Sequence, residues 1–378
     1  MSPALRIGAT GFGLIAVCYG FARFAFGLFL PQIDADLHLG PTLSGVISGG
    51  SFLGYCIAII ASAIMTERVG ARAVGTAAGV VAAVGMAGIA LAPSATWLAV
   101  SVLVAGSSTG LASPPMAAAV AAAVRQKQQD TTNTAINAGT GAGVALCGPI
   151  ALAMTGQWRL AFATFAATAA LLAVTAAFAL PTATGGTPPG SRPRLSRALL
   201  RLIAASVLMG VASTAIWSFG SQLVSQRLGW GATGTGLLWS LIGAGGIAGV
   251  GTGGLVARFG LSHVHRIFLV LLALAILMVG AGSATPVMVL VGGAIFGAAY
   301  VILSGVYLIW GLRAVPDRPA TGLTIGFVSL AIGQTAGAPA FGLLLGALGA
   351  NAAVVIFATV SVVTSLLHTP AKRPQVTA

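Results

Sequence analysis

Apolar runs of about twenty residues alternate along the chain with short stretches that hold charges, prolines or polar clusters. A helix needs roughly 20 apolar residues to cross the hydrocarbon core of a membrane. The pattern therefore predicts an all-α membrane protein with twelve transmembrane helices. They are predicted at residues 7–30, 42–64, 73–93, 96–123, 132–155, 160–180, 199–224, 233–256, 265–283, 286–312, 320–346 and 351–368.

Composition supports this class. Of 378 residues, 57% are hydrophobic and only 6% are charged, whereas soluble domains carry about 25% charged residues. The 53 glycines suit membrane helices, in which small residues let backbones approach closely. Cys18, Cys56 and Cys147 lie inside apolar runs without a nearby histidine, so we expect neither a metal nor another cofactor. A catalytic cluster is also missing, and an enzyme is not expected.

The net charge of +13 comes from basic residues that lie singly or in small clusters between the apolar runs. This placement is typical of membrane topology rather than of a nucleic-acid surface, so the expected surroundings are a lipid bilayer and no nucleic acid. With the N-terminus inside, fifteen of the 18 basic residues fall in cytoplasmic segments. The bias predicts a multi-pass protein of a cell inner membrane with both termini in the cytoplasm. We expect this protein to be a monomer.

The two halves of the sequence are similar at a constant offset of 190 residues. This offset pairs Gly20 with Gly210, Gln32 with Gln222, Arg68 with Arg258, Gly70 with Gly260, Gly143 with Gly333 and Pro149 with Pro339. Residues 181–198 between the halves lack hydrophobic periodicity and predict a flexible linker. We therefore predict two pseudo-repeated six-helix bundles, at residues 1–180 and 199–378, on either side of a cytoplasmic linker at 181–198.

The loop after the second predicted span reads AIMTERVGAR at residues 63–72 and resembles the motif G-x-L-A-D-R-x-G-R-R of the major facilitator superfamily. Its counterpart at 253–260, GGLVARFG, keeps two glycines and the arginine but has Ala257 in place of the acid. The resemblance, which covers the whole chain, implies a secondary transporter of the major facilitator fold. It also implies a latch between the halves on the cytoplasmic side, with gating residues Glu67, Arg68, Gly70, Arg72, Arg258 and Gly260; an inside-positive loop would carry arginines without that role.

Two local features bear on the branch of the superfamily. Gly148-Pro149 resembles the core of the motif associated with drug antiporters, but the residues around it depart from that motif, and the fourth span has no arginine. The segment Gly20–Phe24 followed by Leu30-Pro31 resembles a bacterial branch with an arginine in helix one. That likeness implies no particular substrate.

Arg23 is the sharpest candidate for a binding residue, because it lies about 16 residues into the first span and leans back toward the midplane. A central arginine costs at least about 2.5 to 3.5 kcal/mol on insertion scales and usually faces a cavity and a partner. No Asp or Glu lies well inside any predicted span, so we hypothesise that Arg23 binds an anionic group of the substrate, most simply a carboxylate. A purely structural role, in which Arg23 bonds to backbone and side-chain oxygens, is the alternative.

Other substrate-binding candidates are aromatic or polar side chains on inward-facing stripes of the predicted helices. They are Tyr19, Asn137, Trp217, Tyr300, Ser304 and Tyr307. Each of them equally suits a hydrogen bond between helices. All four histidines, including His263 and His265, lie near predicted span ends or in loops, so the sequence shows no dedicated internal proton site.

The function predicted from these features is a permease that moves a small organic solute, with an organic anion as the hypothesis that Arg23 favours, by alternating access. A multidrug/proton efflux antiporter is the main alternative. A channel-like facilitator and a non-transporting sensor on the same fold also remain open, as do the direction of transport and the coupling ion.

Overall fold

The computed structural model describes residues 2–154, 156–182, 196–316 and 319–369, and it is helical almost throughout, with no strand in that part of the chain. The elements are α1 (Pro3–Ile15), the π-helix η1 (Ala16–Phe24), α2 (Ala25–Leu37), α3 (Gly40–Ala90), α4 (Ala95–Ala123), α5 (Gln126–Ala153), α6 (Trp158–Ala179), α7 (Arg197–Trp217), α8 (Gly220–Leu228), α9 (Ala232–Gly246), the 3₁₀-helix η2 (Ile247–Gly251), α10 (Thr252–Phe259), α11 (Leu261–Gly280), α12 (Pro286–Ala314) and α13 (Pro319–Ser365). Within the described residues, 10 helical stretches are long and apolar enough to cross a membrane.

Two of these stretches turn back at a glycine. α3 has 51 residues, and Gly70 inside it has φ 88° and ψ 162°; α13 has 47 residues and a similar break at Gly349 (φ 79°, ψ 169°). Only glycine adopts such angles without strain. Divided at these two glycines, the helical stretches give twelve segments, which agrees with the predicted number.

Gly260, the pseudo-repeat partner of Gly70, adopts nearly the same angles, φ 80° and ψ 154°, between α10 and α11. The loop motif and its counterpart therefore make the same turn, at Gly70 and at Gly260. This shared geometry follows the 190-residue offset that the sequence shows.

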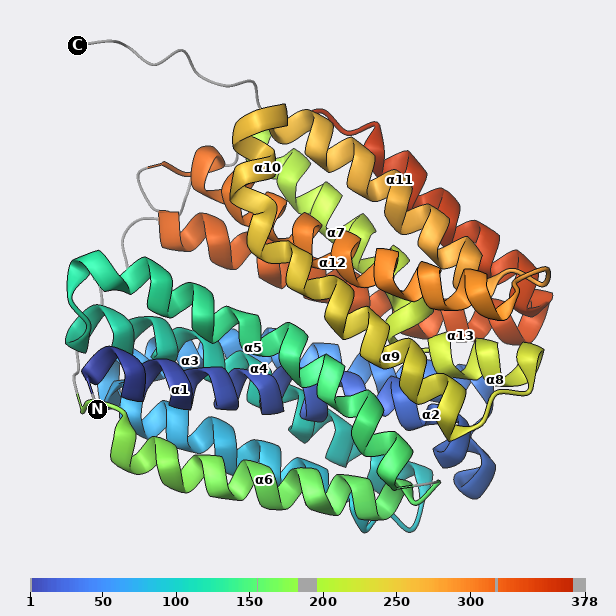
Figure 1. Cartoon of the computed structure of the whole chain (residues 1–378), viewed down its shortest axis with the longest axis horizontal. Helices are drawn as coiled ribbons and strands as arrows, with labels where there is room; N and C mark the ends of the chain where they lie inside the picture. Colours follow the sequence, from blue (N-terminus) through green and yellow to red (C-terminus); the bar gives the residue numbers. More distant parts are fainter. Residues whose placement is uncertain (1, 155, 183–195, 317–318, 370–378) are drawn as a thin grey trace.

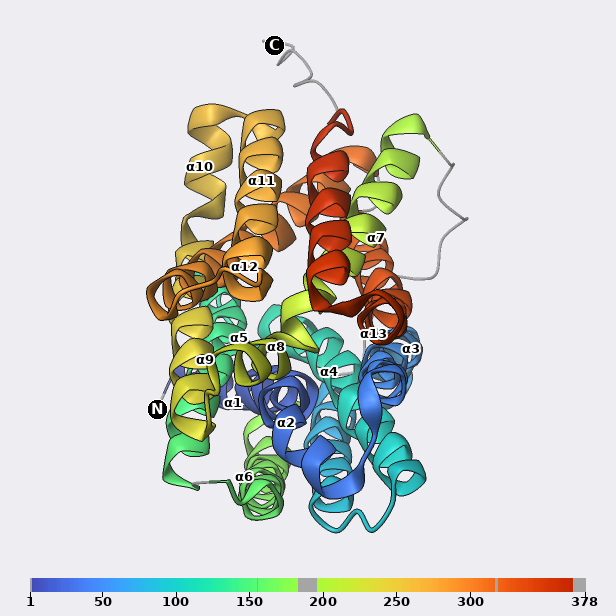
Figure 2. The same cartoon turned by 90° about the vertical axis from the view of Figure 1, so that its right-hand side faces the viewer.

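Figures 1 and 2 show the helices in two groups, the N-terminal half (η1 and α1 to α6) and the C-terminal half (η2 and α7 to α13). In Figure 1 the two halves lie against each other at the right and diverge toward the left, where α1 begins. Contacts of α2 with α8, α3 with α13 and α5 with α9 join the halves. Residues 183–195 of the predicted linker lie outside the described residues.

Glycines hold the first transmembrane segment against α5. A methyl group on Gly143 would clash with the carbonyl oxygen of Ala16, and one on Gly20 would clash with the backbone of Gly143. The thiol of Cys147, one turn further along α5, donates to the carbonyl oxygen of Gly20 at 3.4 Å. Such backbone contact between membrane helices needs small residues on both partners.

The C-terminal half repeats this crossing between α7 and α13. Methyl groups on Gly210 and Gly333, the repeat partners of Gly20 and Gly143, would clash with the carbonyl oxygens of Leu330 and Val207. Each half is thus internally close-packed at corresponding places.

We expect Gly143→Ala to lower the thermal unfolding temperature of the purified protein, because the added methyl group pushes η1 off α5. Overpacking of this kind costs about 1–3 kcal/mol. Gly8→Ala is the matched control: its methyl group would lie 3.5 Å from Thr132 on the same helix pair, which is ordinary van der Waals contact. Equal unfolding temperatures for the two variants would contradict the crossing.

Candidate functional site

A π-helical stretch in the middle of the first segment positions the candidate arginine. η1 covers Ala16–Phe24 and includes Arg23, and the chain returns to α-helix at Ala25. π-Helical turns are rare and recur at functional sites. Here the stretch coincides with the backbone contact of Gly20 on α5, so the close crossing and the altered turn lie at the same level of the membrane segment.

Four aromatic rings surround the Arg23 guanidinium. Its central carbon lies 4.4 Å from the ring centre of Tyr55, 5.0 Å from Phe52, 5.2 Å from Phe24 and 5.7 Å from Tyr19. The side chain is only 5% exposed. Each desolvated cation–π contact is worth about 0.5 to 2 kcal/mol, so this aromatic cage, formed by Tyr19, Phe24, Phe52 and Tyr55, stabilises the charge without neutralising it.

The hydrogen-bond partner of Arg23 comes from the opposite half. The Nη2 atom of Arg23 donates to Oε1 of Gln334 on α13 at 2.6 Å. Gln334 donates through Nε2 to the hydroxyls of Ser213 (3.3 Å) and Tyr300 (3.2 Å). These donor roles orient the amide so that its oxygen faces the guanidinium.

Apart from this hydrogen bond, the positive charge of Arg23 has no counter-ion among the described residues. Its Nε atom is buried without a hydrogen-bond partner, and no described carboxylate forms an ion pair with it. A buried cation that is bonded to a neutral amide keeps most of its positive charge uncompensated. The arrangement can therefore attract an anion to the junction of the two halves.

A second group of rings lies beside the aromatic cage. Trp217 stacks on Phe24 with ring centres 4.1 Å apart, and its ring meets Tyr300 edge-on at 5.1 Å. Trp217 and Tyr300 also line a small cavity of about 20 Å³, with Thr140 of α5 and glycines of α9 and α12 around them. The indole nitrogen of Trp217 is buried without a partner.

The predicted binding residues fall into two groups. The structure brings Tyr19, Trp217 and Tyr300 together around Arg23, and the Tyr19 hydroxyl hydrogen-bonds Ser113 at 2.9 Å. Of the other three, Ser304 contacts the site through the backbone of Tyr300, whereas the described residues show no contact of Asn137 or Tyr307 with Arg23, Gln334 or the aromatic cage.

Each of these three has a different setting. Asn137 is exposed one turn before the cavity-lining Thr140, and Ser304 is half-buried with its hydroxyl bonded to the Tyr300 carbonyl at 2.8 Å. Tyr307 packs against His265 of α11, with ring centres 5.8 Å apart. A substrate role for Tyr307 stays a prediction, and its present neighbours lie inside the C-terminal half.

At one end of the molecule the two halves are closed against each other. Ser48 donates to the Ser218 hydroxyl at 2.6 Å, and Gln222 donates to the carboxylate of Asp34 at 3.3 Å. Gly45 and Gly148 are in backbone contact with the opposite half as well, because methyl groups on them would clash with α13 and α9 respectively. Figure 2, seen from this end, places α2 beside α8.

The predicted gating residues lie toward the other, divergent end. Arg72 donates through Nε to the carbonyl oxygen of Leu180 at 2.7 Å, which is a bond within the N-terminal half. Glu67, Arg68 and Arg258 are exposed. The predicted latch across the halves is therefore not engaged in this conformation, and the gating role stays a prediction.

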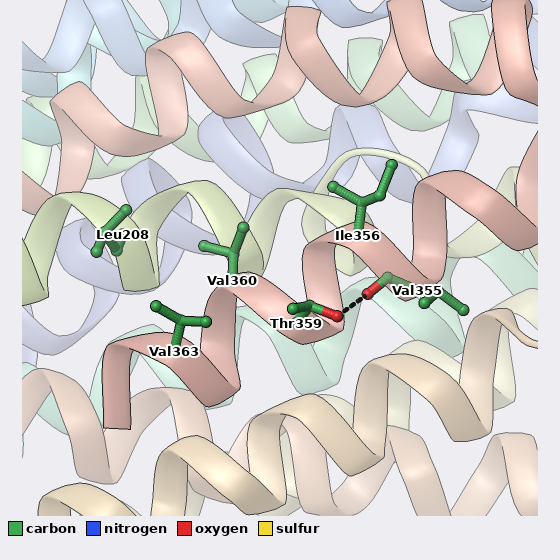
Figure 3. Close-up of a pocket in the computed structure, with 6 residues that line it drawn as sticks. All are labelled: Leu208, Val355, Ile356, Thr359, Val360 and Val363. Atoms are coloured by element: carbon green, nitrogen blue, oxygen red, sulfur yellow. Dashed lines mark hydrogen bonds between the residues drawn. The ribbon is translucent and has the colours of Figure 1, made fainter. Parts of the chain in front are cut away.

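The larger cavity, of about 300 Å³, lies elsewhere, between α7 and the last part of α13 (Figure 3). Its lining is aliphatic apart from Thr359, whose hydroxyl is satisfied by the Val355 carbonyl at 2.8 Å. It offers a charged or polar solute no group to bind, so we do not assign it as the functional site.

Sequence reasoning missed Gln334, Phe52 and Tyr55, and it placed His265 near a span end, whereas the imidazole is fully buried one turn inside α11. Gln334 gave one usable signal, because it is the single amide in a long apolar run. Its partner lies 311 residues away in the chain, and no pattern along the sequence reveals that pairing.

Comparison with known proteins gives a consistent result. The family model described as Major Facilitator Superfamily matches residues 12–328. Among solved structures, the nucleoside transporter NupG is 14% identical with a TM-score of 0.77, covering 97% of this chain and 98% of its own. A bacterial homologue of the human lysosomal transporter Spinster, in an inward-facing and occupied conformation, is 14% identical, with a TM-score of 0.78 and coverage of 96% and 95%.

A D-xylose–proton symporter is likewise 14% identical, with a TM-score of 0.76 and coverage of 97% of each chain. At such identities these likenesses show the fold alone. No curated protein sequence matches the chain.

Proposed function

The chain belongs to the Major Facilitator Superfamily, and on that premise we propose that it is a permease that carries a small organic anion across the membrane by alternating access. Membership makes it a secondary transporter rather than an enzyme. The proposed site lies between the two halves, where this fold binds its solutes near the bilayer midplane.

One observation carries the proposal. Arg23 is a buried cation at the contact between the halves, and its side chain donates a hydrogen bond to a neutral amide, whereas no described carboxylate pairs with it. A substrate anion bound at this position would neutralise the charge of Arg23. The planar guanidinium fork matches a carboxylate in two-point geometry, so a carboxylate is the expected anionic group.

Gln334 occupies the position on Arg23 that the substrate anion would take. Its amide oxygen now accepts the hydrogen bond that a substrate carboxylate oxygen would accept, and the amide is a weaker acceptor because it is uncharged. The substrate therefore has to displace Gln334 from Arg23. Because this bond joins the two halves, its exchange links anion binding to their relative movement.

The surroundings of Arg23 favour an amphipathic solute. Tyr19 and Tyr300 offer hydroxyls, whereas Phe24, Phe52 and Trp217 offer apolar surface. A cationic drug would gain little here, because the aromatic cage is already filled by the chain's own guanidinium. Like charges would also repel each other in this buried site.

Basic residues lie mostly at the divergent end, so the positive-inside rule places that end in the cytoplasm and the closed end outside. We assign the conformation as inward-facing on this basis. Arg72 bonds within its own half rather than to the other half, which agrees with an open cytoplasmic side. In the outward-facing state we expect the Asp34–Gln222 and Ser48–Ser218 bonds to break.

We expect small monocarboxylates and dicarboxylates to raise the thermal unfolding temperature of the purified protein, and cationic amphiphiles to leave it unchanged. A ligand at 100 times its Kd stabilises the folded state by about 2.7 kcal/mol. Stabilisation by cationic amphiphiles alone would instead favour drug efflux and contradict the anion site.

A carboxylate that stabilises the protein should also show saturable uptake in proteoliposomes. Saturable flux without single-channel currents supports a carrier. Single-channel currents would identify a channel-like facilitator, and binding without flux would identify a sensor.

A further inference from the structure

A second buried polar cluster lies inside the C-terminal half, away from Arg23. His265 of α11 is fully buried, and its ring meets Trp310 edge-on at 5.6 Å and Tyr307 at 5.8 Å, both of α12. Tyr307 and Trp310 are themselves 6.3 Å apart and no more than 2% exposed. Three polar aromatic side chains thus meet one turn inside the membrane segment.

The polar atoms of these three side chains have no hydrogen-bond partner. Both ring nitrogens of His265, the hydroxyl of Tyr307 and the indole nitrogen of Trp310 are buried without a hydrogen bond. The backbone of Thr364 on α13 lies close enough to influence the imidazole, yet no hydrogen bond of normal geometry forms. Each buried unsatisfied group costs about 1–3 kcal/mol, so the cluster is under-satisfied in this conformation.

The imidazole must be neutral here. An imidazolium would bury two N–H donors and a full charge without an acceptor, which is far more costly than burying the neutral ring. The electrostatic surroundings also oppose protonation, because the charged side chains on the elements packed at this end of α11 are exposed arginines. They are Arg258 of α10, Arg313 of α12, Arg197 and Arg201 of α7, and Arg266 of α11 itself.

Among the described residues of these elements, the remaining titratable groups add no counter-charge. Tyr307 is neutral at ordinary pH, His263 points to the exposed surface of α11, and α13 carries no titratable side chain from Thr321 to Ser365. A protonated His265 would therefore need water or a better-aligned bond to the Thr364 backbone, and either change requires the cytoplasmic ends of α11, α12 and α13 to shift.

We propose that His265, together with Tyr307 and Trp310, forms a proton-binding site inside the C-terminal half, empty in the inward-facing conformation and filled when the ends of α11 and α12 move apart. Histidine is the side chain whose ordinary pKa, about 6.5, lies nearest neutrality. A proton that binds only one conformation shifts the population toward it. Any coupling of this proton to solute transport rests on the proposed function, whereas proton binding itself does not.

The pH dependence of unfolding tests the site in the full-length protein. Because the folded state disfavours the charged ring and the unfolded state does not, stability should fall as the pH drops below about 6.5. We expect the unfolding temperature of the wild type to fall between pH 8 and pH 5.5 by about 2–4 °C more than that of His265→Gln. His263→Gln is the matched control: its exposed ring bonds only to the Phe259 carbonyl, and the variant should keep the wild-type pH dependence.

A second measurement guards against a folding defect in the variant. In protein labelled with ¹⁵N-histidine, the signal absent from His265→Gln should stay that of a neutral ring at pH 6. An imidazolium signal from His265 at pH 6, or equal pH dependence of unfolding in all three proteins, would overturn the proposal. The two proposals can fail separately. If His265→Gln loses the pH dependence of unfolding but no carboxylate binds to the wild type, the anion site is wrong and the proton site is supported.

Discussion

Arg23→Gln is expected to weaken carboxylate binding by roughly 30-fold to several thousand-fold, the range that corresponds to the 2–5 kcal/mol lost when one partner of a buried charge pair is removed. Glutamine can still bond to Gln334, but it presents neither the charge nor the fork that a carboxylate needs. Isothermal calorimetry or thermal stabilisation, titrated with a carboxylate that stabilises the wild type, measures the change.

The unliganded Arg23→Gln variant should be at least as stable as the wild type. No described carboxylate pairs with Arg23, so its removal leaves no buried counter-charge behind and relieves the cost of burying a cation. This expectation separates the anion role from a structural one. A variant that unfolds well below the wild type while keeping carboxylate affinity would show that Arg23 is structural.

Two further variants complete this test. Arg159→Gln removes the same charge from an exposed site, where Arg159 pairs with Asp36, and should leave carboxylate affinity unchanged. Arg23→Lys keeps the charge but loses the planar fork, and an intermediate affinity is expected.

Gln334→Glu is expected to abolish carboxylate binding and transport. The new carboxylate would stand where the amide oxygen now lies, 2.6 Å from Nη2 of Arg23, and would form an internal ion pair across the two halves. A tethered carboxylate competes at an effective concentration of about millimolar or higher, and its charge-assisted bond is about twice as strong as the present one. Affinity for an external carboxylate should fall by at least about 100-fold.

Gln334→Ala should act in the opposite direction, because it removes the internal competitor for Arg23 and so raises carboxylate affinity. Gln128→Glu makes the same chemical change at an exposed position on α5 and should have no effect. Ligand binding and uptake that survive in Gln334→Glu would exclude Arg23 as the anion site. The same binding and uptake assays serve all three variants.

Hydropathy predicts the helices here because crossing a membrane imposes a length and an apolar composition that are written along the chain. The turns at Gly70 and Gly260 were predictable for a similar reason, since a loop motif with a glycine at a fixed place needs a backbone that only glycine adopts. Arg23 stood out because charge is expensive in hydrocarbon.

Hydropathy does not predict how each helix is rotated about its own axis. Tyr300, Ser304 and Tyr307 form one stripe by spacing, yet Tyr300 reaches Gln334 and Trp217 whereas Tyr307 packs against His265. Helix packing decides which neighbour each member meets. In a chain so rich in glycine and alanine, many rotations satisfy hydropathy equally, so partners such as Gln334 become visible only in three dimensions.

The divergence of the two halves at one end has a mechanical consequence for the surrounding bilayer. A body that is closed at one end and splayed at the other displaces more area in one leaflet than in the opposite leaflet, and switching to the opposite state reverses the difference. The populations of the inward-facing and outward-facing states then depend on the lateral pressure in each leaflet of the bilayer. Lipids with small headgroups and lipids with large headgroups should shift it in opposite directions, so bilayer composition acts on this protein as an effector without occupying a site.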